Sequence, residues 1–173
     1  MEWGDWVNPV SGDQWSALEI TTSGSPLQLL FEIANGWPPP FAFLYVLVVT
    51  RDEEWEPSRY QSEWFDDIAS VRDALVPFTS FLEGDGRHEL WLFASTVQKQ
   101  IVWSRHDILH VYGDDERTKE RLVAQGYRAP VRAEIPVPHS HHYHAEYDGD
   151  FLRFMREFVW SQSPLHIDDG ERR

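Results

Sequence analysis

Alternating apolar and polar side chains predict most of the strands in this chain. Leu27, Leu29, Phe31 and Ile33 recur at every second position, with Gln and Glu among the residues between them, which is typical of a strand with one buried face. Residues 41–49 are apolar throughout and predict a central strand that is buried on both faces. Further strands are predicted at 15–22, 88–94, 99–104, 108–112 and 131–137, and an irregular arm at 1–15.

Apolar residues three to four positions apart predict helices. The first begins at Ser58 or Ser62 and ends near Val76. The second is mostly charged, begins at 114 or 115, and ends near 125, before a glycine that suits the end of a helix. The third begins at 148 or 150 and ends before Ser163. The stripes of the first and third helices are Trp64, Phe65, Ile68, Val71 and Leu75, and Phe151, Phe154, Met155, Phe158 and Val159.

This order of elements favours an α+β fold, with a mostly antiparallel sheet and about three helices packed mainly on one face. One parallel βαβ pair is predicted near the C-terminus, where the strands at 108–112 and 131–137 flank the charged helix. We expect a single domain over residues 1–162, because a chain of 173 residues is of ordinary length for one domain. A polar tail is predicted at 163–173.

The charge of the chain excludes several classes of partner. Fifteen Lys and Arg against 29 Asp and Glu give a net charge of −14. Such an acidic surface is unsuited to nucleic-acid phosphates and to anionic lipids, so we expect neither nucleic acid nor a membrane as a partner. The longest apolar run is too short to span a bilayer, and the first residues lack the pattern of a signal peptide. We therefore expect a cytoplasmic protein.

Composition and motifs also restrict the chemistry. Without cysteine there is no disulfide, thiolate zinc site or cysteine nucleophile. The signatures of serine hydrolases, phosphate-binding loops, zinc proteases and EF-hands are missing, and residues 104–107 (Ser-Arg-His-Asp) are interpreted as a polar turn. The nine Trp residues are scattered without a shared period, so we interpret them as core packing.

One candidate binding region is acidic. Eight Asp and Glu residues fall within positions 52–73, against three Arg within 51–73. Acidic side chains interleaved with Trp suit docking onto a basic protein, because charge steers the encounter and a large ring anchors it. The simpler interpretation is a solvated surface. The candidate partner-binding residues are Asp52, Glu54, Trp55, Glu63, Asp66, Asp67 and Asp73, with Trp64 as a second anchor.

The other candidate region is rich in histidine. Four of the eight His residues fall within 139–144, and imidazole is a common ligand of zinc and other divalent transition metals. If the two C-terminal strands were parallel neighbours, a histidine of the first would approach this cluster and complete a site. A surface His turn without a ligand is the alternative. The candidate metal ligands are His110, His139, His141, His142, His144 and Glu146.

Two functional hypotheses follow. The favoured one is a non-enzymatic, acidic binding protein of inhibitor or immunity type, which docks a basic protein partner and needs no cofactor. The alternative is a small metal-dependent hydrolase that uses the His cluster at 139–146.

Overall fold

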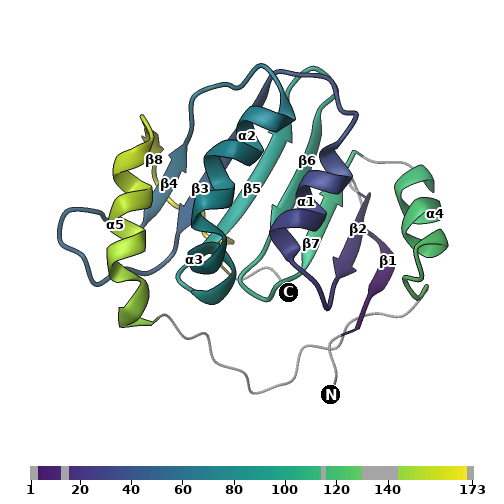
Figure 1. Ribbon diagram of the computed structural model, residues 1–173, viewed down its shortest axis with the longest axis horizontal. Helices are drawn as coiled ribbons and strands as arrows, with labels where there is room; N and C mark the ends of the chain where they lie inside the picture. The colour runs from purple at the N-terminus through teal and green to yellow at the C-terminus, as the bar shows by residue number, and fades with distance from the viewer. Residues whose placement is uncertain (1–3, 13–15, 114–115, 130–143, 171–173) are drawn as a thin grey trace.

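One antiparallel sheet organises the chain (Figure 1). The computed structural model describes residues 4–12, 16–113, 116–129 and 144–170. The sheet has eight strands in the order β1-β2-β7-β6-β5-β3-β4-β8, and all neighbours are antiparallel. The strands are β1 (Trp6–Ser11), β2 (Ser16–Thr21), β3 (Phe41–Leu47), β4 (Ser58–Gln61), β5 (His88–Ala94), β6 (Lys99–Trp103), β7 (Leu109–Tyr112) and β8 (Ser161–Ser163).

Helices lie mainly on one face of this sheet. In the view of Figure 1, α1, α2, α3 and α5 lie in front of the strands, and α4 lies beside β1. None of the described helices is long and apolar enough to cross a membrane. The helices are α1 (Pro26–Ala34), α2 (Ile68–Leu75), α3 (Thr79–Gly84), α4 (Glu116–Ala124) and α5 (Asp148–Glu157), with short 3-10 helices η1 (Val76–Phe78) and η2 (Ala145–Tyr147). The α+β class is confirmed, with five α-helices in the described residues instead of about three.

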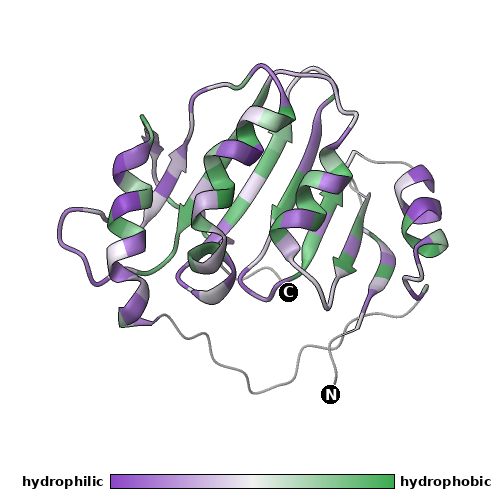
Figure 2. Cartoon of the chain, viewed as in Figure 1, coloured by the Kyte–Doolittle hydropathy of each residue, from purple (hydrophilic) through white to green (hydrophobic). Residues whose placement is uncertain are grey.

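The main core lies between the sheet and these helices. Alternate residues of β3, Phe43 and Tyr45 among them, face α5 and pack around Phe154. The residues between them face the other side, where Val46 belongs to a smaller cluster with Trp91. Strand β3 lies between β5 and β4, which confirms the predicted buried central strand for 41–47. Figure 2 shows hydrophobic residues concentrated along the central strands and hydrophilic residues along α4 and α5.

Residues 27–33 form part of a helix, so the predicted strand is wrong. The Gln28 N–H donates to Ser25 Oγ at 3.1 Å and caps the start of α1. Pro26 occupies the first turn, where its missing N–H costs nothing. The alternation misleads because most of α1 is buried. A helix that is buried on most sides carries apolar residues at a spacing of two as well as at three and four.

The helix predicted from Ser58 or Ser62 to Val76 is wrong in its first half. Residues 58–61 form β4, and Phe65 continues in extended backbone that exchanges two hydrogen bonds with Phe41, at 2.7 and 2.9 Å. Helix α2 begins only after Asp67, whose Oδ1 accepts the N–H of Ser70 at 2.7 Å. The residues of the predicted stripe that pack in the main core are Phe65, Ile68, Val71 and Leu75.

The predicted parallel pair is also wrong. Residues 109–112 of β7 pair with β2 on one side and with β6 on the other, both antiparallel. Both edges of β7 are therefore occupied, and no edge is left for a parallel partner. The second strand of the predicted pair, 131–137, lies outside the described residues. The crossover prediction assumed that consecutive strands are neighbours, whereas β7 pairs with a strand about 90 positions earlier.

Both edges of the sheet hold strands that were not predicted. Residues 6–11 form β1 within the predicted irregular arm. At the other edge, α5 ends at Glu157, and residues 161–163 pair with β4 as β8. Arg59 then binds Asp169 with two hydrogen bonds of 2.6 and 2.8 Å. Part of the predicted polar tail is thus attached to the sheet, through pairings that local periodicity does not encode.

The buried position of Leu47 gives a test of this core. Leu47 is fully buried at the end of β3, so we expect Leu47→Ala to lower the free energy of unfolding by about 2–5 kcal/mol. Val159 is 69% exposed, and Val159→Ala should change stability by less than about 0.5 kcal/mol. Urea denaturation of both variants measures the difference. Equal stability of the two variants would contradict the assignment of β3 as the core strand.

Candidate functional site

The predicted partner-binding residues lie at opposite ends of β4 (Figure 1). Asp52, Glu54 and Trp55 precede β4, in the loop that joins it to β3, whereas Glu63, Asp66, Asp67 and Asp73 follow it. Because a strand of four residues spans about 13 Å and the two connections leave from its two ends, these residues do not form one continuous patch. The structure therefore divides the predicted acidic surface in two.

The first group serves largely to fix its own loop. Asp52 Oδ1 accepts the backbone N–H groups of Glu54 and Trp55 at 2.8 and 3.2 Å. Glu54 forms an exposed ion pair with Arg156 at 2.7 Å. The Trp55 ring packs edge-on against Tyr60, with the ring centroids 5.7 Å apart. These contacts give the loop a structural role and occupy the side chains that a partner would use.

The second group includes residues that neighbour an exposed tryptophan in the sequence. Trp64 is 50% exposed, and its ring rests edge-on against Phe93 with the centroids 5.5 Å apart. Asp67 accepts the Ser70 N–H, and this hydrogen bond lowers the pKa of its carboxyl group. Its charge therefore persists into acidic solution. We call this group the Trp64 surface: Glu63, Trp64, Asp66, Asp67 and Asp73, all of them exposed.

The candidate metal ligands are brought together only in part. His139, His141 and His142 lie outside the described residues. His110 is buried on β7 with Nδ1 3.9 Å from a Glu19 oxygen, on the face opposite to the main core. His144 packs against Tyr147 on the helix side, and Glu146 is exposed. His110 and His144 are thus on different faces of the sheet. Within the described ranges, no three His, Asp or Glu residues converge on a metal position.

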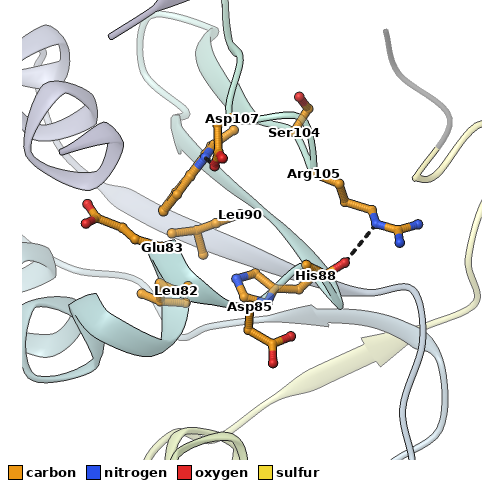
Figure 3. Close-up of a pocket in the computed structure, with 11 residues that line it drawn as sticks. Leu82, Glu83, Asp85, His88, Leu90, Ser104, Arg105 and Asp107 are labelled. Carbon is orange, nitrogen blue, oxygen red and sulfur yellow. Dashed lines mark hydrogen bonds between the residues drawn. The ribbon is translucent and has the colours of Figure 1, made fainter. Parts of the chain in front are cut away.

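A pocket that the sequence analysis did not find lies at the end of the sheet where β5 begins (Figure 3). It has a volume of about 190 Å³ and is bounded by the end of α3, the start of β5 and the turn between β6 and β7. Three of its charged lining residues are acidic and one is basic: Glu83, Asp85 and Asp107, and Arg105. A neighbouring hollow of about 410 Å³ beside Thr22 and Gly24 shares Glu83 and Asp107.

His88 is the buried polar group of this pocket. It begins β5, is 5% exposed, and stacks against Tyr45 with the ring centroids 4.8 Å apart. Its Nδ1 is buried without a hydrogen-bond partner. Burial lowers the pKa of His88 to about 4 and outweighs the nearby charge of Asp85, which favours protonation. The imidazole is therefore neutral at physiological pH.

Two carboxylates line the rim of the pocket, those of Glu83 and Asp107. Asp107 lies in the β6–β7 turn with a left-handed backbone (φ 56°), and its Oδ1 accepts the Trp103 Nε1–H at 3.2 Å. Although Asp107 is exposed at the tip of the turn, the groups around its carboxyl desolvate it and raise its pKa. The charge of Glu83 raises this pKa further. Glu83 itself accepts hydrogen bonds from Ser25 Oγ and from the Leu27 N–H, which hold it at the start of α1.

A buried ion network holds the turn beside the pocket. Arg87 donates to both oxygens of Asp85 at 2.9 Å and to Asp148 at 2.8 Å. Burial alone would raise the pKa of Asp85, but the hydrogen bonds and the charge of Arg87 outweigh it and lower this pKa. Of the acidic residues that line the pocket, Asp85 is therefore matched by a cation, and Glu83 and Asp107 provide the remaining negative charge.

The sequence contained only faint signals of this pocket. The glycines at 84 and 86 marked a turn, and residues 104–107 were interpreted correctly as another turn. Nothing in the local pattern showed that the two turns face each other, because α3 was not predicted and β6 and β5 bring them together through long-range pairing.

Comparison with protein-family models, with curated proteins and with solved structures finds no match to this chain.

The pH dependence of stability tests whether His88 is buried with a lowered pKa. In the unfolded chain the pKa of a histidine is about 6.5, above the folded value of about 4. Between these values the unfolded chain binds more protons, so stability falls as the pH falls through this window, by about 3 kcal/mol in total. His88→Gln removes this contribution. We therefore expect its unfolding free energy to fall less steeply than that of the wild type between pH 7 and 4.

Urea denaturation at a series of pH values measures both slopes. His88→Asn also lacks the titrating imidazole but packs differently from His88→Gln. It should show the same shallower slope, which attributes the change to the lost titration and not to a packing defect of one variant. Identical slopes for the wild type and both variants would show that His88 is accessible to protons in the folded chain.

Proposed function

We propose that this protein is a non-enzymatic acidic binding protein, of inhibitor or immunity type, that docks a basic protein partner through the Trp64 surface. The observation that supports it is the half-exposed ring of Trp64, which lies within three positions of the exposed residues Glu63, Asp66 and Asp67. Tryptophan in such a position is the side chain that most often dominates binding energy in protein interfaces. The neighbouring carboxylates would favour a partner with a positively charged surface.

The anchor is held in place without being covered. Trp64 lies three residues after the end of β4 and rests against Phe93. The next residue, Phe65, is fixed to Phe41, the first residue of β3, by two backbone hydrogen bonds. A ring that is already ordered loses little conformational entropy when a partner covers it. The surface therefore has the rigidity that an anchor residue needs.

The net charge of −14 supports the proposed partner class. A protein with this charge attracts basic proteins over distances of about the Debye length, roughly 10 Å at 0.1 M salt, and accelerates their encounter. Long-range attraction by itself does not select an orientation. The Trp64 surface supplies a defined point of contact for a partner that this field has attracted.

A pair of matched variants tests this proposal. Glu63→Gln with Asp66→Asn removes two charges from the Trp64 surface and leaves Asp67, the cap of α2, in place. Glu53→Gln with Glu56→Gln removes the same charge at the opposite end of β4. Each variant and the wild type, immobilised, would capture proteins from a lysate of the source cells at about 0.1 M salt. We expect a basic protein to be lost with the first variant and kept with the second.

Trp64→Ala should lose the same protein, because truncation of a central interface tryptophan costs about 2 kcal/mol or more of binding energy. Circular dichroism and thermal unfolding of each variant establish that the fold is retained. Equal recovery of this protein by the wild type and both Trp64-surface variants would contradict the proposed docking surface.

A further inference from the structure

Residues 164–170 form a strap across the face of the sheet that is opposite to the helices. In Figure 1 this segment, which follows β8, passes behind the strands. Leu165 packs against the smaller buried cluster on that face, which includes Trp91. Gly170, at the other end of the segment, is buried against Val48. We call residues 164–170 the C-terminal strap.

One guanidinium group holds this strap in place. Arg59 Nε and Nη2 donate to the two oxygens of Asp169 at 2.8 and 2.6 Å, and Nη1 lies 3.2 Å from His166 Nε2. The side chains of Arg59 and Asp169 are 12% and 0% exposed. The guanidinium carbon also lies 4.9 Å from the centroid of the Trp91 ring. Within the described part of the chain, Arg59 thus makes its side-chain hydrogen bonds with the strap alone.

The strap presents Asp169 and Gly170 in a defined turn. Asp169 Oδ2 accepts the N–H of His166 at 2.7 Å, and the Asp169 N–H donates to the carbonyl of His166 at 3.0 Å. Gly170 has a φ of 78°. A Cβ at this position would lie 2.9 Å from Val48 Cγ1 and 3.3 Å from Arg105 Nη1. The contact therefore requires a carboxylate followed by a glycine.

From this arrangement we infer that the surface beneath the strap is a binding site for an acidic peptide in which Asp precedes Gly, and that the strap occupies it as an internal ligand. A guanidinium held over an aromatic ring offers two parallel donors to a carboxylate. We call this surface the Arg59 site, and it consists of Arg59, Trp91, Val48 and Arg105. None of these residues belongs to the strap, so the site persists when the strap leaves.

The strap is attached weakly apart from this ion pair. It contains no helix or strand, and the three residues of β8 that precede it are exposed. Four of its residues are exposed as well: Pro164, His166, Ile167 and Asp168. Segments with so few buried contacts open locally at a small cost in free energy. A tethered segment also competes at an effective concentration on the order of 1 mM, so the strap blocks the site against a dilute ligand.

The Arg59 site contains none of the residues of the Trp64 surface. Its test needs no basic partner protein, so either proposal can fail without the other.

The experiment titrates the peptide acetyl-Pro-Leu-His-Ile-Asp-Asp-Gly-amide, which has the sequence of the strap, into the full chain at neutral pH. The indole N–H signal of Trp91, whose Nε1 donates to Glu89, is followed by NMR. We expect saturable binding to Asp169→Asn, in which the strap has lost its carboxylate. The wild type should bind at least about tenfold more weakly, because its own strap competes. Equal binding to both chains, or no saturable shift in Asp169→Asn, would overturn the inference.

Two further variants control for the change of charge and for the fold. Asp168→Asn removes the same charge from an exposed neighbour and should bind the peptide as weakly as the wild type. Gly170→Ala displaces the strap by a clash with Val48 and should bind the peptide as Asp169→Asn does. Circular dichroism and thermal unfolding establish that each variant is folded. Weak binding by both Asp169→Asn and Gly170→Ala would refute the site.

Altered peptides test the recognition of Asp and Gly. A peptide with Asn in place of the second Asp, or with Ala in place of Gly, should bind the Asp169→Asn chain at least about fivefold more weakly. Asn in place of the first Asp should change the affinity by less than about twofold. Equal affinity of all four peptides would contradict the proposed ligand class.

Sedimentation of the wild-type chain identifies the source of an external ligand. Because each copy carries a net charge of −14 and like charges repel, we assign this ligand to a different protein. A monomer at all concentrations supports this assignment. A dimer that Asp169→Asn dissociates would show instead that two copies exchange their straps, and would overturn it.

Discussion

The buried guanidinium of Arg87 is the interaction on which the arrangement of α3, β5 and α5 depends. It is 1% exposed, bound to Asp85 and Asp148, and lies over the ring of Phe151 at 4.9 Å. A charge in such surroundings is tolerable only when its partners are in place, since loss of one partner from a buried pair typically costs about 3–5 kcal/mol. Asp148 is the first residue of α5. The ion pair with Arg87 therefore holds the first residue of α5 beside β5.

The same network places the pocket. Asp85 Oδ2 also accepts the backbone N–H of His144 at 3.1 Å, and the carbonyl of Arg87 accepts N–H groups from Val48 and Val49 at the end of β3. The turn at 84–86 is thus tied to both α5 and the central strand. His88 follows Arg87 and is carried into the interior, where burial disfavours its protonation. The neutral state of the imidazole is a consequence of this burial.

Sequence patterns correctly predicted the elements that are marked by apolar residues within their own segment. Strands β3 and β5, and the buried stripe of α5, follow from runs of apolar residues that need no knowledge of distant neighbours. Helix α1 was predicted as a strand because it is buried on most sides, so its apolar residues also recur at a spacing of two. The pocket was missed because it depends on contacts between distant segments. The interaction of Glu83 with Asp107 exists only after α3 and the β6–β7 turn have been brought together by the sheet.

The distribution of negative charge explains why few of the many carboxylates can contribute to binding. Residues 1–86 hold 15 Asp and Glu against three Arg, yet exposed pairs such as Glu54 with Arg156 contribute little energy because water and salt screen them. A carboxylate attracts a cation more strongly where solvent is partly excluded, as at Asp107. The same attraction is strengthened where an exposed ring nearby can exclude water once a partner docks, as at Trp64. The overall charge thus attracts cations to the whole surface. Specific binding is confined to the places where the fold has already desolvated a carboxylate or left a large ring uncovered.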